Sequence, residues 1–159
     1  MDSAYAYVAI IEPPGGPDSV STRLGLIPTR VERKGELRGR IVARSNRWIL
    51  ESPVSRTEMD LRRHVCELLA AVEPKRDEIR ELVDMCSGRF TVVAFHHYSN
   101  QEFSLTKDQA SLISQLGLEV WCDFYSLPED EPNQLPDPTS SSVTPAAGAA
   151  GAPSVAADH

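Results

Sequence analysis

Hydrophobic and polar residues follow two periods along this chain, and they predict strands interrupted by helices. Four runs rich in apolar, aromatic or β-branched residues predict strands: 5–11 (YAYVAII), 47–51 (RWILE), 90–97 (FTVVAFHH) and 118–124 (LEVWCDF). The run 90–97 is apolar on both faces, so we expect it in the middle of a sheet. The run 118–124 alternates, which predicts one apolar face from Leu118 to Phe124.

A helical period predicts the intervening elements. The clearest helix opens at Thr57 and carries one apolar stripe, made of Leu61, Val65, Leu68, Leu69 and Val72. Pro74 suits the first turn of a second helix, which Gly88 ends, and we expect an antiparallel pair.

Shorter elements complete the pattern. We expect a helix from Asp18 to Gly25 and another from Thr106 to Gly117, because Asp and Thr cap helix starts and glycine ends helices. Residues 29–45 read as a loop or edge strand, and residues 103–105 as a short edge strand.

Strands separated by helices in this order predict an α+β fold. We expect a two-layer sandwich of about four strands with the helices on one face, ferredoxin-like with the helical pair inserted mid-chain. Residues 1–125 form this single domain. Residues 126–159 are dense in Pro, Ala, Ser and Gly, so we expect a disordered tail.

Several short motifs in order resemble a bacterial family catalogued as domain of unknown function 4279, over residues 4–125. They are LGLIPT (24–29), Lys34-Gly35, RWILES (47–52), Pro74 and LGL (116–118). The resemblance implies a compact cytoplasmic α+β domain. It brings no catalytic or ligand residue to this chain.

Composition narrows the class of protein further. The 159 residues carry three separated cysteines, which argues against a disulfide framework and for reduced thiols. No apolar run approaches the roughly 20 residues that span a bilayer. The start MDSAYAYVAI has an acid where a signal peptide has bases. We therefore expect a cytoplasmic protein without a membrane segment.

Charge is distributed unevenly. The basic segment, residues 23–47, holds eight cations against two acids, a balance of +6, which leaves −13 for the rest of a chain of net charge −7. The candidate contact residues for an anionic partner are Arg30, Arg33, Lys34, Arg38, Arg40 and Arg44. We favour a protein partner with an acidic face.

Two alternatives for this segment stay open. Its cations can instead pair with the acid-rich helices as an ordinary solvated loop. Nucleic acid is another partner that the cations suit, although the chain as a whole is acidic, with a pI near 5.1. Trp48 beside Arg47 could stack on a base, but its alternation with Leu50 favours the core. Lys34-Gly35 lacks the rest of a phosphate-loop motif.

The sequence contains no convincing catalytic or metal-binding constellation. Adjacent His96 and His97 point to opposite faces of a strand, so we expect one buried and hydrogen-bonded and the other exposed. His96 could meet Cys122 if their strands are neighbours. No zinc spacing occurs, and Glu119 with Asp123 is the remaining paired-acid candidate. We assign no catalytic residue, metal or cofactor and favour a non-enzymatic interaction module, with a ligand pocket between sheet and helices as the alternative.

Overall fold

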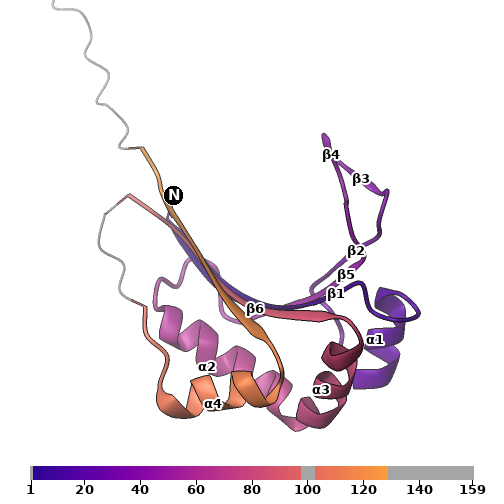
Figure 1. Ribbon diagram of the computed structural model, residues 1–159. Coiled ribbons are helices and arrows are strands. Elements are labelled where there is room, and N and C mark those ends of the chain that lie inside the picture. The colour runs from indigo at the N-terminus through magenta and orange to yellow at the C-terminus, as the bar shows by residue number, and fades with distance from the viewer. Residues whose placement is uncertain (1, 98–102, 129–159) are drawn as a thin grey trace, which may run out of the picture. The chain divides into compact units, whose positions relative to one another are not determined.

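The computed structural model describes residues 2–97 and 103–128, and five strands there form one mixed sheet (Figure 1). In sheet order they are β2 (Arg30–Glu32), β5 (Arg47–Glu51), β1 (Ser3–Ile11), β6 (Ser87–His96) and β7 (Glu119–Ser126). β1 pairs antiparallel with β5 and β6, whereas β6 and β7 are parallel. The run 90–97, which was predicted for the middle of a sheet, is therefore part of an interior strand, β6, which lies between β1 and β7.

Four helices cover one face of this sheet (Figure 1). They are α1 (Pro17–Leu24), α2 (Leu61–Val72), α3 (Arg76–Met85) and α4 (Lys107–Gln115), with a short 3₁₀ turn, η1 (Glu73–Lys75), between α2 and α3. The chain crosses from β5 to β6 through α2 and α3, and from β6 to β7 through α4. Each crossover joins two parallel strands, and both move across the sheet in the same direction, toward β7. Because such connections are right-handed, the helices of both crossovers lie on the same face of the sheet.

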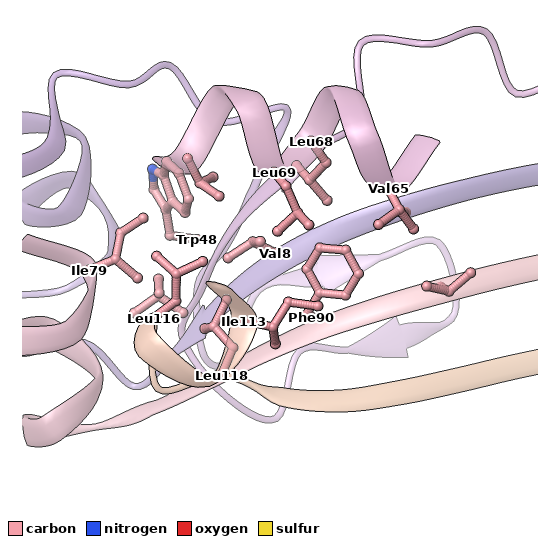
Figure 2. Close-up of a cluster of buried hydrophobic side chains, with 14 of the residues drawn as sticks. Val8, Trp48, Val65, Leu68, Leu69, Ile79, Phe90, Ile113, Leu116 and Leu118 are labelled. Carbon is pink, nitrogen blue, oxygen red and sulfur yellow. The ribbon is translucent and has the colours of Figure 1, made fainter. Parts of the chain in front are cut away.

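Alternate strand residues meet these helices in one core. Val8, Trp48 and Phe90 point from the sheet toward the helices, and all three are fully buried. Figure 2 shows them among side chains from α2, α3, α4 and the segment between α4 and β7, namely Val65, Leu68, Leu69, Ile79, Ile113, Leu116 and Leu118. The stripe predicted for α2 is thus the stripe that packs on the sheet.

The predicted α+β class is confirmed, with five strands in place of about four because β2 joins the sheet edge. The crossover from β5 through α2 and α3 to β6 is a split βαβ unit, because its two strands are parallel and the antiparallel β1 lies between them. The second crossover departs from the ferredoxin-like arrangement, because it joins the neighbouring parallel strands β6 and β7. The helical pair also packs separately: α2 contacts β1 and α4, and α3 contacts α1 and β6.

Several element ends differ from prediction because other residues supply the caps. α2 starts at Leu61 because the Asp60 side chain accepts a 3.0 Å hydrogen bond from the Arg62 N–H. Gly88 belongs to β6 and does not end α3. Residues 103–105 form no strand. Gly25 ends α1 with a left-handed φ of 64°, and Thr106 caps α4, both as predicted.

β7 continues to Ser126, two residues beyond the predicted end. The rest of the predicted tail, from residue 129, lies outside the described residues. Within the described ranges, no helix is both long and apolar enough to cross a membrane.

Candidate functional site

Part of the basic segment forms a hairpin, the arm (residues 33–45), which stands away from the sheet on the side opposite the helices (Figure 1). Its strands are β3 (Leu37–Arg38) and β4 (Ile41–Val42). The Gly35 N–H donates to the Ala43 carbonyl at 2.8 Å, and the Ala43 N–H donates to the Glu36 carbonyl at 2.9 Å. The segment predicted as a loop or edge strand is therefore β2 followed by a separate hairpin.

Local sequence explains the turn of the arm. Gly39 and Arg40 form its two-residue loop, between the paired residues Arg38 and Ile41. Gly39 has a φ of 59°, and a glycine with positive φ at the first loop position is what a type II′ hairpin turn requires.

The base of the arm is held by Asn46. Its side-chain oxygen accepts the Lys34 N–H at 3.0 Å, and its amide donates to the Glu12 carboxylate at 3.2 Å. The Glu12 N–H donates in turn to the Asn46 carbonyl at 2.8 Å. Glu12 has a φ of 53°, the left-handed region that is costly for a residue with a side chain. These hydrogen bonds fix both ends of the hairpin to the residue that follows β1, Glu12.

The arm exposes apolar side chains that no part of the described body covers. Leu37 is 66% exposed, Ile41 75% and Val42 52%. Leu37 and Val42 are paired across the hairpin, so they share one face. A hollow of about 570 Å³ lies beside Ile41 and is lined by Lys34, Arg40 and Arg44 among others.

Four cations of the basic segment pair with three nearby carboxylates. Arg33 donates two hydrogen bonds to Asp18, at 3.0 and 2.9 Å, and Arg23 pairs with Glu81. The other two share one acid: Arg30 lies 3.3 Å and Arg47 3.9 Å from the Glu32 carboxylate. Glu32 belongs to the segment itself, so only Asp18 and Glu81 lower its balance, from +6 to +4.

Three candidate cations are different. Within the described ranges, no carboxylate lies within 4.0 Å of the side-chain nitrogens of Lys34, Arg40 or Arg44, and all three side chains are on the arm. Arg38 lies in β3, opposite Ile41, and only its backbone is described. The five candidate residues whose side chains are described therefore divide: Arg30 and Arg33 pair with acids, whereas Lys34, Arg40 and Arg44 have no carboxylate within reach among the described residues.

Trp48 is in the core and not in a stacking position. Its ring is fully buried, and its indole N–H donates to the Ser21 hydroxyl at 2.9 Å. The interpretation from its alternation with Leu50 is confirmed.

The histidines do not form a site together. His96 is buried, and its Nδ1 has no hydrogen-bond partner among the described residues. His97 is half-buried, and its Nδ1 lies 2.5 Å from the Asp2 carboxylate. One histidine is buried as expected, but the ring nitrogen that has a side-chain partner belongs to the other. Cys122 pairs with Val92, four residues from His96, although their strands are neighbours. Among the described residues, no three His, Cys, Asp or Glu side chains gather closely enough to hold a metal ion.

Sequence reasoning missed the face of the sheet that carries no described helix, the open face. Cations cover two of its aromatic rings: the Arg56 guanidinium lies 4.1 Å from the centre of the Tyr5 ring, and Arg89 lies 4.2 Å from the centre of the Trp121 ring. Glu119 pairs with Arg89 at 3.7 Å. The alternation in 118–124 signalled this face, but the sheet order was needed to find the partners.

Comparisons with known proteins agree with the resemblance found in the sequence. Residues 2–127 match the model of a family described as a domain of unknown function, DUF4279. No curated protein and no solved structure matches the chain.

Proposed function

Because this chain belongs to the DUF4279 family, whose description assigns no activity, we propose its function from the arm: it is a non-enzymatic interaction module that binds an acidic protein face. The observation that carries the proposal is the combination, on one projecting hairpin, of three cations without a carboxylate partner in the described structure and three exposed apolar side chains.

The charges supply orientation and the apolar residues supply contact area. Exposed cations attract an acidic partner and orient it, with most of their effect on the association rate. Leu37, Ile41 and Val42 then lose water on contact, at roughly 25 cal/mol per Å² of buried apolar surface. An acidic partner face with an apolar centre fits this combination.

The strongly negative remainder of the chain favours a protein over nucleic acid. With +6 in the basic segment and −13 elsewhere, a long polyanion that extends past the arm meets repulsion from the body. A partner face of the arm's own size avoids this repulsion. The pairing of Arg33 with Asp18 leaves Lys34, Arg40 and Arg44 as the cations of the arm without a carboxylate partner among the described side chains.

A charge-reversal experiment tests the proposal. The full chain is used to capture partners from a lysate of its source cells, as wild type and with Lys34, Arg40 and Arg44 changed to Glu. A matched control changes the cations Arg62, Arg63 and Lys107 on the helical side to Glu, with the same change in net charge. Exposed pairs contribute about 0.2–1 kcal/mol each, so the loss of three, about 0.6–3 kcal/mol, should weaken binding of a captured protein by about threefold to 150-fold.

The outcome separates the alternatives. Loss with the arm variant and retention with the control supports the arm as the contact. Equal recovery by both variants contradicts it. A gel shift with duplex DNA whose affinity falls by roughly 0.9 log units per neutralised phosphate per log unit of salt would establish the nucleic-acid alternative instead.

A further inference from the structure

β7 is an edge strand that lacks the usual protection against pairing with another strand. Edge strands are commonly kept short, charged with lysine, broken by proline or bulged. β2, the opposite edge, is three residues long and carries Arg30 and Glu32. β7 has eight residues, contains no lysine or proline, carries its two acids, Glu119 and Asp123, on the open face only, and pairs with β6 in an unbroken register from Glu119 to Ser126. No described strand pairs with its outer side.

The hydrogen-bond pattern identifies the backbone groups at this edge. The Leu127 N–H donates to the His96 carbonyl at 2.7 Å, so odd-numbered residues of this strand bond to β6. In a parallel ladder the N–H and C=O of successive residues point alternately to the two sides. The backbone groups of Val120, Cys122 and Phe124 therefore point outward, available to a further strand.

Side chains on both faces of β7 are also partly exposed. Val120 is 45% and Phe124 40% exposed on the face that points toward the helices, and Trp121 is 44% and Tyr125 48% exposed on the open face. Cys122, between Val120 and Phe124, is exposed as well. A strand added here would bury apolar surface on both sides while it satisfies the outward backbone groups.

We propose that this edge pairs with β7 of a second copy of the chain, antiparallel, with Cys122 opposite its counterpart on the two-fold axis. A closed two-fold contact of one edge with itself leaves no free edge for further growth. The two sheets then continue as one, and the arms lie at its two far ends, because β2 and β7 are the opposite edges of each sheet.

Charge selects this register among the neighbouring ones. Antiparallel residues that lie directly opposite share a face, and like charges there are destabilising. A register centred on Asp123 puts two Asp123 carboxylates opposite each other, and one centred on Trp121 puts Glu119 opposite Asp123. Centring on Cys122 puts Val120 opposite Phe124 and Trp121 opposite Asp123. Registers centred further out pair fewer of the eight strand residues.

Sedimentation velocity of the full chain over a range of concentrations tests the pairing. We expect wild type to reach twice the 17.5 kDa of one chain. Cys122→Lys, which places two ammonium groups opposite each other, should remain monomeric. Cys66→Lys makes the same change at an exposed cysteine of α2 and should still dimerise. Circular dichroism checks that each variant is folded. A wild type that stays monomeric, or a dimer that survives Cys122→Lys, overturns the proposal.

Cross-linking tests the register without a disruptive change. In Cys66→Ser/Cys86→Ser, Cys122 is the only thiol left in the chain. Opposite residues in an antiparallel pair have Cα atoms roughly 4.5–5.5 Å apart, so a short bismaleimide should join the two thiols rapidly. A dimer of this variant that the reagent does not cross-link contradicts the register.

Discussion

The indole N–H of Trp48 donates a 2.9 Å hydrogen bond to the hydroxyl of Ser21, although the Trp48 ring itself is fully buried. The bond joins β5 to α1, and Trp48 follows directly on Arg47 and the Asn46 that holds the base of the arm. The largest core side chain and the anchor of the candidate site are therefore close in sequence and in space. Loss of core packing at Trp48 should also loosen the arm.

Truncation of Trp48 should destabilise the domain strongly. Trp48→Ala removes a buried aromatic ring, which typically costs about 3–5 kcal/mol of unfolding free energy. Ser21→Ala leaves the indole N–H without a partner, at a cost of about 1–3 kcal/mol. Denaturant titration measures both. In a Trp48→Phe background Ser21→Ala should cost much less, because no donor is then left unpaired. Equal costs in the two backgrounds would show that the hydrogen bond contributes little.

Gly88 should not tolerate a side chain. A Cβ at this position would lie 2.6 Å from both Leu118 Cδ2 and Val83 Cγ2, well inside contact distance. Overpacking of this kind costs about 1–3 kcal/mol, so Gly88→Ala should lower the thermal midpoint. The neighbouring Ser87→Ala is the control and should change it little. A midpoint equal to that of wild type would mean that β6 can move away from α3 at low cost.

Alkaline pH should destabilise the protein through Tyr5. Partial burial of the phenol raises the pKa of Tyr5, against the opposing effect of the Arg56 guanidinium. Because folding favours the neutral phenol, its contribution is present below the ordinary tyrosine pKa of about 10 and is lost as pH rises through the raised value. Tyr5→Phe should therefore lose less stability than wild type across that alkaline range, measured by denaturant titration at each pH. Parallel losses in the two proteins would contradict this role.

The start of α4 should depend on its capping box. The Thr106 hydroxyl accepts the Gln109 N–H at 3.2 Å, and the Gln109 side chain accepts the Thr106 N–H at 2.9 Å. Thr106→Ala should cost about 1 kcal/mol of unfolding free energy. Lys107→Ala changes an exposed residue of the same turn and should cost less. If the two variants were equally stable, the cap would not be what holds this end of the helix.

Signals within a few residues predicted many of the elements correctly. The stripe from Leu61 to Val72 did become the buried face of α2, and the run of apolar residues in 90–97 did become the central strand. Prediction failed where a residue suits two local roles. Gly88 suits the end of a helix, but in the structure its lack of a side chain allows β6 to pass close to Val83 and Leu118.

The candidate site was visible in the sequence only as a concentration of charge. Which cations are neutralised depends on partners that lie 15 residues away for Arg33 and 58 residues away for Arg23. Exposure of the arm's apolar residues likewise depends on the hairpin standing away from the sheet. Neither fact can be obtained from composition.

Hydrophobic periodicity by itself determined the α+β class and the position of most elements. The reason is that the buried face of a strand or a helix follows from the spacing of apolar residues over a few neighbouring positions in the chain. The tertiary structure alone decided the strand order, the open edge at β7 and the division of the basic segment into paired and projecting cations. These features depend on which distant segments of the chain come into contact. A charged residue or an edge strand is compatible with many such contacts, and only the packed core selects one of them.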